Sequence, residues 1–204
     1  MPDSSLADFV THGREERNLE YKSSFPWDGN TGKRLRARVT KTCLAMANVT
    51  GGGTVVVGVV EKPPGVFSLE GMSSEHLPTF TQDLVQPHLN QYADPYVDVT
   101  VTPIRLDGGG TFVVLQVRPF DRIPVMCKRN GLEGLRAAAI YTRARKKHET
   151  IEVPSQSEMR EILEQSTQIS VNRWVESNHA AGLLIFLEPE VQDPAQFDKQ
   201  LEDL

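Results

Sequence analysis

The stretch Ala45–Lys62, AMANVTGGGTVVVGVVEK, decides the fold of this chain. It starts at the end of an amphipathic pattern, passes through Gly51–Gly53, and continues as an apolar run over Val55–Val60 that one glycine interrupts. This order predicts a helix, a turn of left-handed glycines that ends the helix, and then a buried strand. Because a phosphate-binding loop needs a strand before its glycines and a helix after them, the order argues against nucleotide binding.

Periodicity on both sides of this stretch predicts an α+β fold. A helix is expected from about Lys33 to Asn48, with its apolar stripe at Leu35, Val39, Cys43 and Met46. Shorter helices are expected over Leu6–Val10 and Glu75–Leu89, and a closing helix that Ser155 and Glu158 cap, ending near Asn178. Strands are expected over Leu19–Phe25, Thr54–Glu61, Tyr96–Ile104, Thr111–Val117, Val125–Lys128 and Ala137–Arg145. Because strands follow one another without helices between them, we expect a mixed or largely antiparallel sheet flanked by helices.

Composition places the chain among ordinary globular proteins. It has 204 residues, 39% of them hydrophobic, and a net charge of −5. Its longest apolar runs are far too short to span a membrane, and its two cysteines show no metal-binding spacing. We therefore expect a protein of the reducing cytoplasm without membrane association. Residues 1–178 are expected to form one domain and residues 179–204 a C-terminal extension.

Four charged residues near the predicted strands could form a site. Glu20 and Lys22 share a face of the first strand, Glu15 precedes that strand, and Glu61 ends a later one. If the two strands are neighbours, the three carboxylates could converge on a divalent cation that activates water, with Lys22 neutralising a phosphate. The alternative is a solvated face with an exposed Glu–Lys pair, which contributes little to stability.

Basic residues gather at three places despite the negative net charge. An aromatic residue beside arginines suits a sugar–phosphate backbone and an unstacked base, although a solvated basic edge that protects a sheet would show the same pattern. The candidate nucleic-acid-binding residues are Arg34, Arg38 and Lys41 on the long helix, Lys128 and Arg129 at a turn, and Tyr141, Arg143, Arg145, Lys146 and Lys147 on and after a late strand.

Five motifs, in order between about Gly13 and Leu163, resemble the Schlafen AlbA-like domain family. The motifs are Glu15 with Leu19–Lys22, then Ala45–Gly52, Thr54–Glu61, Ile140–Arg143 and the Ser155–Glu158 helix start. The resemblance implies a nucleic-acid-binding lobe. It also implies that Glu15, Glu20 and Glu61 correspond to the acids with which some Schlafen proteins bind Mg²⁺ or Mn²⁺ and cleave structured RNA such as transfer RNA.

Three functions remain open at the level of sequence. The first is a metal-dependent endoribonuclease, with RNA favoured over DNA. The second is a regulatory module that binds DNA or RNA without catalysis, and the third is a protein-interaction or assembly domain. Schlafen cores pair two such lobes around a basic channel, so a chain with a single lobe implies a homodimer.

Overall fold

The computed structural model describes residues 4–145, 149–153 and 156–181. The chain divides into two compact units, one ending at Thr167 and the other beginning at Gln168. Most of the expected C-terminal extension, and Ser155 of the expected helix cap, lie outside the described ranges. No helix within those ranges is both long and apolar enough to cross a membrane.

A four-stranded sheet forms the centre of the first unit. Its strands are β1 (Leu19–Lys22), β2 (Gly53–Val57), β7 (Thr111–Val117) and β6 (Val99–Arg105), in that spatial order. The pair β1–β2 is parallel, whereas β2–β7 and β7–β6 are antiparallel. The mixed sheet with its helices confirms the predicted α+β class, and β6 and β7 confirm the predicted hairpin.

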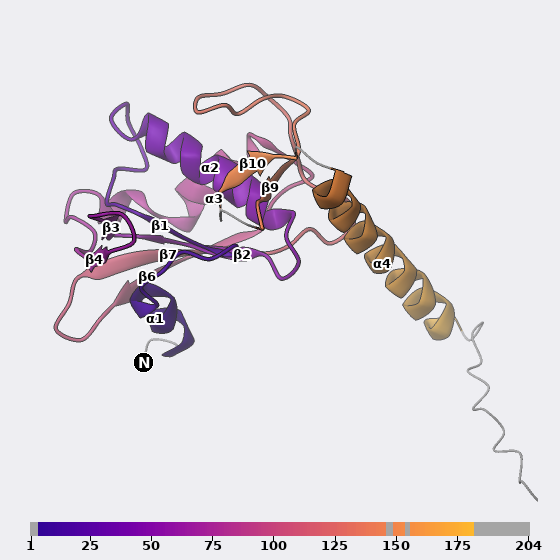
Figure 1. The fold of residues 1–204 in the computed structure, drawn as a ribbon, viewed down its shortest axis with the longest axis horizontal. Helices are drawn as coiled ribbons and strands as arrows, with labels where there is room; N and C mark the ends of the chain where they lie inside the picture. Colours follow the sequence, from indigo (N-terminus) through magenta and orange to yellow (C-terminus); the bar gives the residue numbers. More distant parts are fainter. Residues whose placement is uncertain (1–3, 146–148, 154–155, 182–204) are drawn as a thin grey trace, which may run out of the picture. The chain divides into compact units, whose positions relative to one another are not determined.

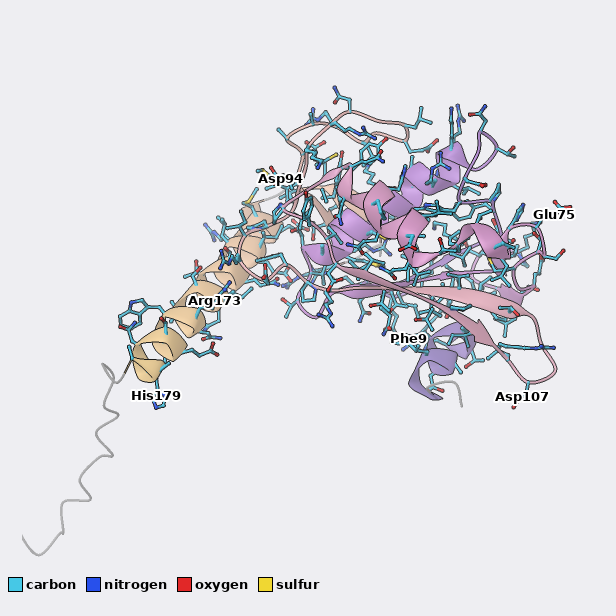
Figure 2. All side chains as sticks on the ribbon, turned by 180° about the vertical axis from the view of Figure 1, so that it is seen from behind. Phe9, Glu75, Asp94, Asp107, Arg173 and His179 are labelled. Carbon is cyan, nitrogen blue, oxygen red and sulfur yellow. The ribbon has the colours of Figure 1, made fainter. Side chains whose placement is uncertain are left out.

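Two helices cover opposite faces of this sheet, α2 (Lys33–Ala47) on one face and α1 (Ser4–Thr11) on the other (Figure 1). Phe9 on α1 and Asp107 in the turn between β6 and β7 can be located in Figure 2. Because side chains alternate along a strand, β1 divides its residues between the two faces. Leu19 and Tyr21 join the buried core beside α1, whereas Glu20 and Lys22 face a charged cavity beside α2.

The glycine run ends α2 as the sequence predicts. Gly51 and Gly52 have φ of +82° and +75°, the left-handed region in which a side chain is strained. A Cβ at Gly52 would also lie 2.1 Å from the carbonyl oxygen of Val117 on β7. Glycine at this position therefore lets the chain turn tightly from the helix into β2.

The predicted strand Thr54–Glu61 is confirmed as extended chain, but Gly58 divides it into two strands. Gly58 has φ of +112°, and a Cβ there would lie 2.9 Å from the backbone of Gly71. The chain leaves the central sheet at this residue. It continues as β3 (Val59–Glu61), which pairs with β4 (Phe67–Leu69) in a separate hairpin. Glu61 thus ends a strand of this hairpin and not a strand of the central sheet.

The predicted helix Glu75–Leu89 is also interrupted. A short 3₁₀ turn, η1 (Leu77–Thr79), precedes α3 (Gln82–Asn90), because Thr81 between them is extended, with φ −105° and ψ 154°. Two small antiparallel pairs complete the unit, β5 (Ala93–Asp94) with β8 (Met126–Cys127) and β9 (Tyr141–Arg143) with β10 (Thr150–Glu152). The last helix, α4 (Gln156–Ala180), begins in the first unit and ends in the second.

Candidate functional site

A cavity of about 430 Å³ lies beside α2 and β1 in the first unit. Its lining brings together side chains that are distant in sequence, and nearly all of them are charged. We call it the charged cavity. Its acids are Glu15, Glu20, Glu133 and Glu149, its bases are Lys22, Arg38, Lys41 and Arg143, and Thr42 and Thr150 complete it.

Arg143 of β9 is the most deeply buried charge of this cavity, with its side chain only 1% exposed. Its Nη2 lies 2.7 Å from Oε2 of Glu20 on β1, and its Nη1 donates to Oγ1 of Thr150 at 3.1 Å. Its Nε donates to the backbone oxygen of Arg17 at 3.1 Å. A guanidinium so buried and so fully bonded joins β1 to β9 and is not available to grip a phosphate. The burial of Arg143 thus argues against the predicted contact with nucleic acid, which stays a prediction.

Glu15 and Glu20 line the cavity together, as the sequence suggests. Oε1 of Glu15 accepts a hydrogen bond from the backbone N–H of Tyr21 at 3.0 Å. Burial, followed by the negative charge of Glu20, raises the pKa of the Glu15 carboxyl. Lys22 forms an ion pair with Glu20 and donates to the backbone oxygen of Tyr21 at 3.0 Å. Both oxygens of Glu20 are thus occupied by cations, one by Lys22 and the other by Arg143.

Glu61 does not join these two acids. Its side chain lies in the exposed β3–β4 hairpin, where Oε1 accepts the N–H of Gly65 at 2.7 Å. Within the described part of the chain, no group of three or more His, Cys, Asp or Glu residues could hold a metal ion. The expected convergence of Glu15, Glu20 and Glu61 is therefore wrong, and the reason is the left-handed turn at Gly58. Glu15 and Glu20 alone therefore do not make up the expected three-carboxylate metal site.

Three of the five basic residues of α2 lie on one face, at positions i, i+4 and i+7, and we call them the basic face of α2: Arg34, Arg38 and Lys41. The side chains of Arg34 and Arg38 are 82% and 57% exposed. All three meet Glu133, from the loop between β8 and β9. Nε of Arg38 donates to its Oε2 at 2.8 Å, Nε of Arg34 lies 3.8 Å from its Oε1, and Nζ of Lys41 donates to its backbone oxygen at 3.5 Å. The hydrogen bond from Arg38 lowers the pKa of the Glu133 carboxyl.

The aromatic residue that the sequence pairs with arginines is not available for stacking. Tyr141 is 1% exposed, and its hydroxyl donates to the backbone oxygen of Gly134 at 2.8 Å and accepts the N–H of Arg136 at 2.7 Å. Lys41 covers the ring, with Nζ 5.0 Å from its centroid. Tyr141 therefore has a structural role, and its burial argues against the predicted stacking of a base, which stays a prediction.

The remaining predicted basic residues differ in their surroundings. Arg145 is exposed and pairs with Glu161 of α4 at 3.1 Å, whereas Lys146 and Lys147 lie outside the described residues. Lys128 and Arg129 are exposed at the start of the loop that carries Glu133. Their roles in nucleic-acid binding stay predictions.

Sequence reasoning missed two residues that organise this region. Glu133 follows the recognisable Asn130–Gly131 turn, but its φ of +55° and its contact with α2 cannot be predicted from the sequence pattern.

Asn48, the second residue, caps α2 and is buried. Its Nδ2 donates to the backbone oxygens of Val125 and Tyr141 at 2.8 and 2.9 Å, and its Oδ1 accepts the N–H of Val125 at 2.7 Å. Asn48 stands three residues before the glycine run, at the predicted end of the helix, and this position was the available signal for the cap.

These features agree with a comparison against known families. The family model described as Schlafen, AlbA_2 matches residues 15–152, which is more than half of the chain. The chain therefore belongs to the Schlafen AlbA_2 family. The match includes every described residue that lines the charged cavity.

Solved structures show weaker likeness. The crystal structure of a protein from Corynebacterium diphtheriae aligns with a TM-score of 0.45 at 16% identity, over 74% of this chain and 26% of that one. The solution NMR structure of the N-terminal domain of a RecG-related protein from Nitrosomonas europaea aligns with a TM-score of 0.43 at 22% identity, over 70% of this chain and 90% of that domain. The aligned region thus spans about a quarter of the Corynebacterium chain. No curated protein matches the chain.

Proposed function

We propose that the protein binds nucleic acid through the sugar–phosphate backbone, at the basic face of α2. The observation that carries this proposal is the alignment of Arg34, Arg38 and Lys41 on one helix face, of which Arg38 and Lys41 also line the charged cavity. Membership of the Schlafen AlbA_2 family supports the same partner. A local basic cluster can bind phosphate even though the net charge of the protein is −5, because binding depends on the electrostatic potential at the cluster and not on the summed charge.

The test is the salt dependence of binding. Fluorescence anisotropy with labelled single-stranded and duplex oligonucleotides would be recorded from about 50 to 200 mM salt, a range over which phosphate contacts weaken strongly. Each of Arg34→Gln, Arg38→Gln and Lys41→Gln is expected to reduce the slope of log K against log salt by about one. Arg105→Gln on β6 is the matched control, since Arg105 is exposed on the edge strand farthest from β1 in the sheet. Equal losses in the control and the three variants would defeat the proposal.

A second candidate is metal-dependent cleavage of structured RNA such as transfer RNA. Its support is that Glu15 and Glu20, two of the three acids that the family resemblance implies for such a reaction, line one cavity. Transfer RNA would be incubated with Mg²⁺ or Mn²⁺ and wild type, Glu15→Gln or Glu20→Ala. Cleavage by wild type alone supports the candidate. No cleavage by any of them leaves a module that binds without catalysis.

Three finer features complete the proposal. The preference for RNA over DNA is tested by competition between matched oligonucleotides. A homodimer would let two single lobes face one channel, and light scattering showing a monomer would count against it. A reducing, cytoplasmic location is supported by the two free thiols, Cys43 and Cys127, both buried.

Burial raises the pKa of the Cys43 thiol to about 12, so this thiol is not a nucleophile at neutral pH.

A further inference from the structure

Two consecutive cations each lie over a tyrosine ring, at a site outside the charged cavity. Nζ of Lys128 is 5.6 Å from the ring centroid of Tyr96, and Cζ of Arg129 is 4.3 Å from that of Tyr92. The pairing of β5 with β8 brings these segments together. Because Ala93 faces Cys127 and the N–H of Lys128 donates to the oxygen of Tyr92 at 2.8 Å, the cations and the rings occupy neighbouring positions.

Tyr96 is the unusual member of this group, because its residue is 76% exposed, more than any other large hydrophobic residue in the described ranges. Its backbone is held on one side by α3. Asn90 accepts the N–H of Val97 at 2.8 Å through Oδ1, and Gln86 donates to the oxygen of Val97 at 2.6 Å through Nε2. Asp94, labelled in Figure 2, marks where β5 leads into this segment. An aromatic ring presented by a fixed backbone can bind a flat group with little loss of conformational entropy.

A cavity of about 230 Å³ opens beside this ring. Pro119 and Phe120 line it together with Tyr96, and Arg118 pairs there with Asp98 at 3.3 Å. The volume is below the roughly 300–1,000 Å³ of pockets for drug-sized ligands. It suits one planar group that enters edgewise and lies against the ring.

We propose that Tyr96 stacks one unpaired base of single-stranded nucleic acid, while Lys128 and Arg129 contact the adjoining phosphates. This inference rests on the proposed function and names the substrate class more closely. Aromatic rings next to cations suit this ligand, because every base offers a π-face and every nucleotide carries a negative charge. A proline-rich peptide would also fit an aromatic groove, but its uncharged backbone offers no anion to Lys128 and Arg129.

The test compares a single-stranded oligonucleotide with the same sequence as a duplex. Tyr96→Ala is expected to weaken single-strand binding roughly 5- to 150-fold, as removal of a stacking aromatic does, and to leave duplex binding unchanged. Tyr96→Phe keeps the ring and is expected to bind as wild type. Leu132→Ala, which removes another exposed apolar side chain from the same loop as Lys128, is the matched control and is expected to have no effect.

Three outcomes would overturn the inference. The first is a Tyr96→Ala variant that binds the single strand as wild type does. The second is an equal loss for duplex and single strand, and the third is binding of a polyproline peptide that depends on Tyr96 in place of the oligonucleotide. If wild type binds neither oligonucleotide, the proposed function fails as well. If wild type binds and only the basic face of α2 matters, the stacking inference alone fails.

Discussion

Nη2 of Arg143 lies 2.7 Å from Oε2 of Glu20, in an ion pair whose two side chains are 1% and 12% exposed. The pair crosses from β9 to β1, and Lys22 binds the other oxygen of Glu20. A buried ion pair costs desolvation energy for both charges, so its presence is weak evidence of stabilisation by itself. Removing Arg143 is a different matter, because the buried Glu20 then keeps its ion pair with Lys22 but loses its partner on β9.

Arg143→Met is therefore expected to lower the free energy of unfolding by about 3–5 kcal/mol. The measurement is urea unfolding followed by circular dichroism. Arg145→Met is the control, because Arg145 is exposed and pairs with the partly exposed Glu161, a contact expected to contribute less than about 1 kcal/mol. Adding Glu20→Gln to Arg143→Met should recover part of the loss, since the buried charge is then removed. A double variant no more stable than Arg143→Met would show that the cost comes from lost packing.

Glu15 and Glu161 should respond to pH in opposite directions. Burial raises the pKa of Glu15 above its usual 4.5, so the stability contributed by its proton is complete below that value and is lost as the pH rises through the folded-state pKa. Glu15→Gln keeps an oxygen to accept the N–H of Tyr21 and loses the charge. It is expected to be more stable than wild type at pH 7, with the difference disappearing below about pH 4.5.

The hydrogen bond from Arg17 to Glu161, at 2.7 Å, lowers the pKa of that carboxyl. Its stability contribution is present above 4.5 and is lost as the pH falls through the folded-state pKa. Glu161→Gln should consequently be less stable than wild type at pH 7 and equal to it in acid. Unfolding curves at several pH values check both variants, and a difference of the same sign for the two would contradict the assignment.

Local periodicity predicted much of this fold, because the pattern of a helix or hairpin is set by neighbouring residues. The predicted helix Lys33–Asn48 matches α2 to within one residue, and β6 and β7 form the expected hairpin. Local periodicity did not predict the turn at Gly58. A glycine within an apolar run fits a continuous strand equally well, and only its close approach to Gly71 reveals the left-handed turn. Because a continuous strand was expected, Glu61 was placed near Glu15 and Glu20, and the expected metal site depended on that placement.

The candidate site was predictable only in part for a related reason. The alternation of side chains along a strand placed Tyr141 and Arg143 on one face, but it could not show whether that face is exposed to solvent or buried. Arg143 is buried because Glu20, more than a hundred residues earlier, lies opposite it. Tyr141 is buried because it packs beneath Lys41 of α2. Burial of a polar side chain depends on such distant partners, which leave no periodic signal.

Asn48 offers a test of the buried contact that closes α2. Asn48→Ala removes three hydrogen bonds to Val125 and Tyr141 and leaves their backbone groups unpaired. Because each such group costs about 1–3 kcal/mol, the expected loss is roughly 3 kcal/mol or more. Asn48→Asp should be similarly harmful, since a carboxylate cannot donate to the two carbonyls. Thr50→Ala, which removes an exposed hydrogen bond to Gln165, is expected to change stability by less than about 0.5 kcal/mol. Comparable losses at Asn48 and Thr50 in thermal unfolding would refute this role.

Glu133 occupies the place where a phosphate would meet the basic face of α2. Its carboxylate lies 2.8 Å from Nε of Arg38 and 3.8 Å from Nε of Arg34, and the lowered pKa keeps it charged at neutral pH. Removing that charge should free the two arginines for nucleic acid. Glu133→Gln is expected to tighten oligonucleotide binding about threefold to tenfold near 50 mM salt, with a smaller gain at higher salt because counterions screen the contact. Glutamine is chosen over glycine so that the left-handed backbone at this position is not also relaxed.

Glu152→Gln is the matched control for this prediction, because it removes an exposed carboxylate that pairs with Arg136. Equal tightening in both variants would mean that net charge alone matters, and that Glu133 does not compete with phosphate.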